Sequence, residues 1–150
     1  MTLDRRHLIA RIVAAASAGA LAWRLAPAAG SAGDVPRVVY HLADADKVGF
    51  VLGNIDNHFK GMGGTDKVRI ALVVHGPALL AFKLGRADAT LAGHLAEIAG
   101  KGVDLGACGN TLDAQKLAVG DLLPGFARID EGGVVRLARL QAEGYAYLRP

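Results

Sequence analysis

The chain has 150 residues, of which 52% are hydrophobic and 21% are charged, so it has the size of one globular domain and is too apolar to be intrinsically disordered. Its formal net charge of +3 comes from the first 32 residues, which hold four of the 17 basic residues and one of the 14 acidic ones. The neutral remainder has no bulk attraction for phosphates, which argues against nucleic acid as a partner.

Residues 1–32 resemble a signal for export by the twin-arginine machinery. Arg5 and Arg6 precede an Ala-rich apolar stretch and then a zone of small residues, as in a cleavable leader. The uninterrupted apolar run, residues 12–23, is too short to span a bilayer comfortably. We therefore expect a periplasmic protein with no stable membrane anchor. The alternative is a leader that stays attached as an anchor or an amphipathic helix.

Residues 35–150 form a single predicted domain in which strand and helix patterns alternate. Apolar, β-branched runs predict strands at about 37–42, 67–75, 102–107, 126–129 and 145–148. Helical spacing predicts helices at about 44–59, 90–99, 110–117 and 134–141. This alternation predicts an α/β fold with a mainly parallel sheet of about five strands and helices on both faces.

Three side chains that can take part in nucleophilic or acid–base chemistry lie where predicted strands end. His41 is near the end of the first strand, His75 ends the second, and Cys108, the only cysteine, ends the third. Ligands of open parallel sheets bind at this edge, and a thiol at a strand-to-helix turn is stabilised as thiolate. Cys108 and His75 are therefore the candidate catalytic residues. A buried cysteine that only packs is the alternative.

Other polar residues are weaker candidates. Asn54 and Asn57 lie within the first predicted helix, where Asn is a poor helix former, so they either bind a ligand or form a solvated face. Turn residues beside the histidine and the thiol are further candidates for ligand binding: Gly76, Gly109, Asn110 and Thr111. No cofactor is predicted. No metal site is predicted either, because Asp44 and Asp46 have no His or Cys at ligand spacing.

Four segments of residues 35–150 together resemble the DsrE/DsrF-like family. They are Asn54-Ile-Asp-Asn57, Val73-Val-His-Gly-Pro77, Ala107-Cys-Gly-Asn-Thr-Leu112 and the ending from Leu140 to Pro150. The resemblance implies a parallel-sheet α/β fold and homo-oligomers, commonly trimers or hexamers. In the sulfur-relay members a cysteine in this region carries sulfur as a persulfide, and Cys108 matches it by position.

The helix that follows departs from the relay proteins, because residues 111–116 are neither Ala-rich nor markedly basic. Two functions follow as expectations. The first is a periplasmic persulfide carrier or sulfurtransferase-like protein that uses Cys108 and exchanges sulfur with a donor or acceptor protein. The second is a non-catalytic oligomeric module that binds a small ligand or a redox partner.

Overall fold

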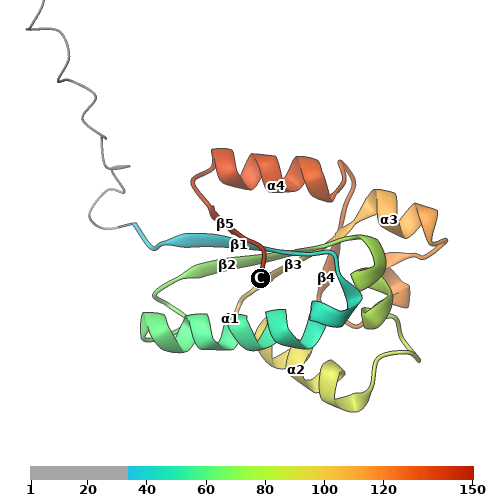
Figure 1. Ribbon diagram of the computed structural model, residues 1–150, viewed down its shortest axis with the longest axis horizontal. Coiled ribbons are helices and arrows are strands. Elements are labelled where there is room, and N and C mark those ends of the chain that lie inside the picture. The colour runs from blue at the N-terminus through green and yellow to red at the C-terminus, as the bar shows by residue number, and fades with distance from the viewer. Residues whose placement is uncertain (1–33) are drawn as a thin grey trace, which may run out of the picture. The chain divides into compact units, whose positions relative to one another are not determined.

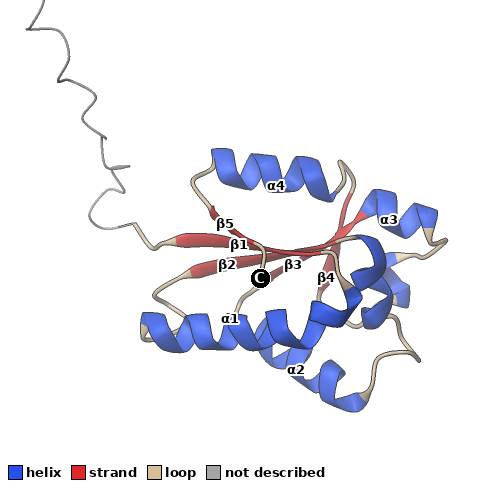
Figure 2. Ribbon diagram, in the orientation of Figure 1, coloured by secondary structure: helices blue, strands red, loops and turns tan. Residues whose placement is uncertain are grey.

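The computed structural model describes residues 34–150, so the predicted export segment lies outside the described residues. The strands are β1 (Arg37–Leu42), β2 (Arg69–Val74), β3 (Asp104–Cys108), β4 (Phe126–Ile129) and β5 (Ala146–Leu148). The α-helices are α1 (Val48–Met62), α2 (Ala89–Gly100), α3 (Gly109–Ala114) and α4 (Gly133–Ala142). Short 3₁₀ helices cover Ala45–Lys47, Gly76–Phe82 and Val119–Asp121. Figure 2 shows helices and strands alternating along the chain.

All strand pairs in the sheet are parallel, and the strand order is β4-β3-β2-β1-β5. The chain runs from β1 to β4 in one direction and then returns through α4 to place β5 on the other side of β1. Because parallel crossovers are right-handed, this reversal moves α4 to the opposite face of the sheet from α1 and α2 (Figure 1). The predicted parallel sheet with helices on both faces is confirmed.

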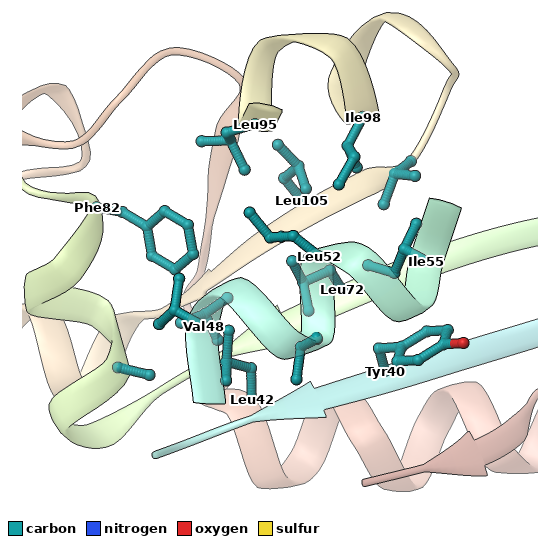
Figure 3. Packing of buried hydrophobic residues seen from close by; sticks show 14 of the residues in the cluster. Tyr40, Leu42, Val48, Leu52, Ile55, Leu72, Phe82, Leu95, Ile98 and Leu105 are labelled. Atoms are coloured by element: carbon teal, nitrogen blue, oxygen red, sulfur yellow. The ribbon is translucent and has the colours of Figure 1, made fainter. Parts of the chain in front are cut away.

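The larger apolar core lies between one face of the sheet and the helices that precede β3. Leu72 of β2 and Leu52 and Ile55 of α1 are at most 1% exposed, and Phe82 and Leu95 close the same cluster (Figure 3). Burying side chains of this size contributes roughly 1.5–3 kcal/mol each. A smaller cluster that includes Val39, Val73 and Leu140 seals α4 against the other face.

The boundaries differ from the sequence expectations in instructive places. The first predicted helix divides into a 3₁₀ turn and α1, and the turn after β2 stays a 3₁₀ helix from Gly76 to Phe82. The helix predicted at about 110–117 begins instead at Gly109, with Cys108 in the N-cap position, and ends at Ala114. Within residues 34–150 no helix has the length and apolar character needed to cross a membrane.

Candidate functional site

The sheet brings His41, His75 and Cys108 to one edge and one face. In the register of the sheet, His41 pairs with Val73, and Val74 pairs with Ala107. His75 and Cys108, which follow Val74 and Ala107, therefore lie at the same level at the ends of their strands. Side chains alternate between the faces of a strand. His41 and Cys108 therefore share the α4 face with the second core cluster. Sequence reasoning predicted their shared edge, whereas the shared face follows from the register.

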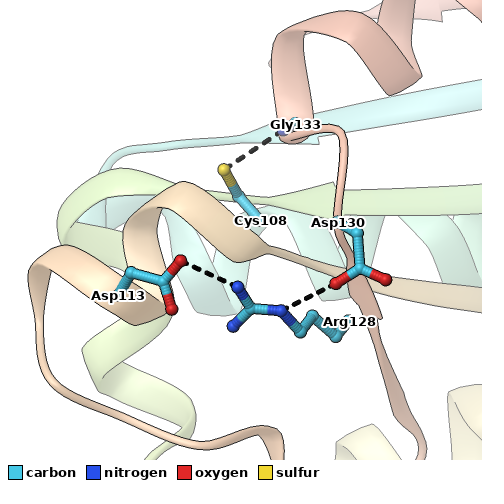
Figure 4. Close-up of polar contacts among 5 residues, drawn as sticks. All are labelled: Cys108, Asp113, Arg128, Asp130 and Gly133. Carbon is cyan, nitrogen blue, oxygen red and sulfur yellow. Dashed lines mark hydrogen bonds and ion pairs between the residues drawn. The ribbon is translucent and has the colours of Figure 1, made fainter.

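The Cys108 sulfur lies against the start of α4. The backbone N–H of Gly133, the first residue of that helix, donates a hydrogen bond to Sγ at 3.1 Å (Figure 4). A Cβ added at Gly133 would lie 3.3 Å from the Cβ of Cys108 and 3.5 Å from the Cβ of His75. The absence of a side chain at Gly133 therefore lets the amide reach the sulfur between these two residues.

The thiol of Cys108 is biased toward its ionised form. Burial alone raises the pKa, since the residue is only 5% exposed, but hydrogen bonds from Gly133, Thr111 and Asn110 outweigh burial and lower it below the ordinary value. Hydrogen bonds to a charged group favour that group's charged state. The site is thus suited to hold a thiolate at neutral pH more readily than an isolated cysteine would.

Two side chains of the α3 region fasten the turn after β2 beside the thiol. The hydroxyl oxygen of Thr111 accepts a hydrogen bond from the N–H of Gly76 at 3.1 Å, and the side-chain amide of Gln115 donates to the carbonyl of Gly76 at 3.0 Å. Gly76 has a φ of +58°, a conformation that glycine adopts without strain. The side chains of Thr111 and Gln115 therefore hold the backbone of Gly76 beside the site.

A cavity of about 250 Å³ opens in front of the thiol. It is large enough for several water molecules or a small ligand. Its walls come from the ends of β2 and β3 and from the start of α4: His75, Cys108, Asn110, Thr111, Glu131, Gly132, Gly133, Val134 and Val135. The cavity brings four of the predicted site residues together.

Two glycines in this region lie where a Cβ atom would clash with neighbouring atoms. A Cβ at Gly109 would lie 2.7 Å from the backbone carbonyl oxygen of Ile129. A Cβ at Gly132 would lie 2.6 Å from the side-chain nitrogen Nδ2 of Asn110. Gly109, a predicted ligand-binding residue, is thus required where backbones pass closely. Asn110 contacts the loop that leads into α4.

The loop between β4 and α4 is held by an ion-pair bridge. Arg128 donates to Asp113 of α3 and to Asp130 of the loop, each at 2.8 Å (Figure 4). The guanidinium therefore ties α3, β4 and the loop that carries Gly133 into one unit.

His41 and His75 contact each other through their ring nitrogens. Their Nε2 atoms form a hydrogen bond, and the Nδ1 of His41 lies 2.5 Å from the hydroxyl of Tyr147 on β5. Burial, the neighbouring His75 and Arg149 lower the pKa of His41 to about 4, against an opposing effect of Asp44. Burial and then Arg149 also lower the pKa of His75, again opposed by Asp44. Both shifts in pKa favour the neutral form of the rings.

Asn54 and Asn57 lie elsewhere. They line a shallow cavity of about 480 Å³ with Tyr40, His58 and the C-terminal residues 148–150, on the α1 side of the sheet. This cavity shares no lining residue with the one at Cys108. The structure therefore does not join the two Asn residues to the thiol.

Sequence reasoning missed several residues at the site. Gly133 acts through its backbone N–H, and Gln115 acts through its side-chain amide on the carbonyl of Gly76. Tyr147 meets His41 only because β5 returns to pair with β1. The paired glycines after β4 were a usable signal, since a close approach of backbone and ligand often needs glycine. Among residues 34–150, no group of three or more His, Cys, Asp or Glu side chains is arranged to hold a metal ion.

Comparison with solved structures supports the fold. A protein of unknown function from Methanobacterium thermoautotrophicum, MTH1491, is 32% identical with a TM-score of 0.68, over 77% of this chain and 99% of that one. The ychN protein of E. coli is 17% identical with a TM-score of 0.58, over 76% and 99% of the two chains. BT1422, a conserved protein of unknown function from Bacteroides thetaiotaomicron, is 13% identical with a TM-score of 0.56, over 76% and 94%.

No curated protein matches the chain. The model of the DsrE/DsrF-like family matches residues 9–150, which is most of the sequence. The family match, together with the identity to the archaeal protein, confirms the resemblance seen in the four sequence segments, and the chain belongs to the DsrE/DsrF-like family.

Proposed function

We propose that Cys108 carries sulfane sulfur as a persulfide inside the cavity at the start of α4. The observation that supports this most is the hydrogen bonding of its sulfur by Gly133 in a cavity that His75 also lines. A nucleophilic thiol needs a stabilised thiolate and a nearby acid–base group. Both are present at this edge of the sheet.

The transfer step needs no external oxidant. The Cys108 thiolate attacks the outer sulfur of a donor persulfide, R–S–SH, and forms a new S–S bond. The S–S bond of the donor breaks, and its electron pair leaves on R–S⁻, which takes up a proton. Passing the sulfur to an acceptor thiolate reverses the same chemistry, with Cys108 as the leaving group. His75 is suited to exchange the proton in both directions.

Access to the sulfur limits the kind of donor. Because Cys108 is 5% exposed, a donor must enter the cavity rather than dock flat on the surface. Inorganic polysulfide, thiosulfate and the end of a thin persulfide side chain meet this requirement. Val134 and Val135 at the cavity are 71% and 43% exposed and offer an apolar rim to a donor or acceptor protein.

Intact-protein mass spectrometry tests the proposal. After incubation with polysulfide and removal of the excess, the wild type is expected to gain the mass of one sulfur atom, and dithiothreitol should remove it. Cys108→Ser is the matched control, since the chain has no other cysteine. An unchanged wild-type mass, or an equal gain on the serine variant, would refute the sulfur-carrier function.

The low exposure of Cys108 also favours the second function, a binding module in which the thiol only packs. Labelling of the native protein by a maleimide separates the two. Rapid labelling near neutral pH supports the carrier, whereas labelling only after unfolding supports the binding module.

The proposal extends to assembly and location. The family resemblance supports a homo-oligomer, a trimer or a hexamer, and the leader supports transport to the periplasm. Sedimentation velocity on residues 35–150 is expected to give a trimer or a hexamer, and a monomer at micromolar concentration would contradict this part of the proposal.

A further inference from the structure

A chain of hydrogen-bonding groups leads from the Cys108 cavity to the outer edge of the sheet. It runs from His75, which lines the cavity, through His41 to Tyr147. Along the outer part of the chain exposure rises, because His41 is 9% exposed whereas Tyr147 is 39% exposed. The chain therefore connects the site to solvent on the β5 side, away from the mouth of the cavity.

The two imidazole rings meet edge to edge. Their planes differ by 18° and their centroids lie 4.6 Å apart, while the two Nε2 atoms are in hydrogen-bond contact. Two stacked faces at that separation could not bring the nitrogens so close, so the atoms point at each other within nearly one plane. One proton is then shared between the rings, donated by one Nε2 and accepted by the other.

The surroundings disfavour the charged form of this pair. Arg149 and Asp44 are the charged groups that act on both rings, and they form an ion pair with each other at 3.2 Å. Tyr147 faces His41 from β5, and Cys108 lies on the cavity side of His75. Because the charged form of either ring is disfavoured here, the pair moves protons most readily by exchanging tautomers, since no ring then has to become cationic.

We infer that His41 and Tyr147 are positioning residues that let His75 take the proton of Cys108 and later return it to the leaving group. The inference rests on the proposed thiol chemistry of Cys108. It assigns a role to two residues that lie outside the cavity, at the point between β1 and β5 where the strand order reverses. Ligand sites of open α/β sheets occur at such points.

The proton steps balance in two halves. In the first, the thiol proton passes to Nδ1 of His75, the nitrogen that remains for the cavity. His75 passes its Nε2 proton to Nε2 of His41, His41 passes its Nδ1 proton to the hydroxyl oxygen of Tyr147, and Tyr147 releases its own proton to water.

The second half runs in reverse when the donor S–S bond breaks. The leaving thiolate takes the Nδ1 proton of His75, and each group regains a proton from the next, with Tyr147 regaining one from water. The rings return to their first tautomers without a charged intermediate. Direct transfer is not required between Cys108 and His75, since the cavity has room for bridging water.

The test compares two uncharged disulfides that react with Cys108 and differ in the basicity of the leaving thiolate. Hydroxyethyl disulfide releases a basic thiolate that needs a proton, whereas dithiodipyridine releases a weakly basic one. Tyr147→Phe is expected to slow the reaction with hydroxyethyl disulfide about tenfold, below the full effect of losing a general acid. Dithiodipyridine should react at the wild-type rate, because the thiol loses its proton in a rapid equilibrium with both reagents and only the basic leaving thiolate depends on the supply of a proton.

A second variant separates proton transfer from a structural role. In His41→Gln the side-chain amide can still hydrogen-bond to His75 but cannot exchange tautomers. We expect it to show the same selective loss as Tyr147→Phe, while Tyr145→Phe, a control on the same segment, shows none. Circular dichroism checks that each variant is folded.

Equal slowing of both disulfides, full activity of His41→Gln, or no reaction of native Cys108 with either reagent would overturn the inference. The assay requires no sulfur donor, so it is independent of the test for sulfur carriage. If Cys108 forms no persulfide but the selective loss is seen, the relay stands and the sulfur-carrier function fails. If Cys108 forms the persulfide but the variants react like the wild type, the relay alone fails.

Discussion

At the scale of single residues, the site depends on where side chains are missing as much as on where they are present. Gly133 brings its amide to the sulfur of Cys108 because no Cβ separates the two backbones. Sequence reasoning identified Cys108 and His75 from their position after apolar runs. It could not identify Gly133 or Tyr147, because their contacts depend on the return of the chain through α4.

Gly133→Ala is expected to disturb the thiol. The new methyl group would lie 3.3 Å from the Cβ of Cys108 and 3.4 Å from Cγ1 of Val73, so the start of α4 must shift and weaken the N–H to sulfur bond. The pKa of Cys108 should rise, measured as the pH dependence of iodoacetamide alkylation. Gly93→Ala in α2 is the control, since nothing lies within 4 Å of its added Cβ. An unchanged alkylation profile for Gly133→Ala would contradict the role of the amide.

The paired histidines should make stability sensitive to acid. The pKa of His41 falls from 6.5 to about 4 on folding, so the unfolded chain binds the proton first as the pH drops. The free energy of unfolding should therefore decline from pH 6.5 and level off, for this residue, near pH 4. Urea unfolding across this range checks it, with His41→Gln expected to decline less. A steeper decline in the variant would show that another group is responsible.

At the scale of elements, the apolar periodicity was sufficient for most of the fold. Residues 37–42 and 126–129 were predicted with the observed bounds because these strands are bordered by turn residues. Helix starts were predicted less well. Cys108 occupies the N-cap position of α3 without a side-chain cap, so the start of this helix does not follow the capping preference of Asn or Thr.

The bridge at Arg128 makes a prediction about how α3 and the loop before α4 are held. Arg128→Gln removes both ion pairs and should lower the free energy of unfolding only slightly, because the pairs are at the surface. The difference from wild type should shrink in high salt. Denaturation by urea at two salt concentrations measures it, with Lys67→Gln as a control for an exposed pair within one turn. A large loss of stability that persists in high salt would mean that the bridge organises the loop more strongly than its exposure indicates.

At the scale of the whole molecule, sequence and structure agree on an α/β domain with a parallel sheet. The family comparison assigns this domain to the DsrE/DsrF-like family. The strand order could not be predicted from the sequence, because alternating strand and helix patterns do not reveal on which side of β1 the last strand pairs. That choice creates the reversal between β1 and β5 and, with it, the contact of His41 with Tyr147. The location of the domain is a separate property of the chain, which residues 1–32 are predicted to determine.

The leader makes a prediction for the intact chain in cells. The proposed export signal depends on the arginine pair itself rather than on positive charge, so changing Arg5 and Arg6 together to Lys keeps the charge but removes the guanidinium groups. We expect the double variant to stay in the cytoplasm at full length, while the wild type reaches the periplasm with a new N-terminus near residue 29 or 33. Cell fractionation and N-terminal sequencing measure both. Arg11→Lys, outside the pair, should be exported like the wild type, and export of the double variant at the wild-type level would contradict the twin-arginine assignment.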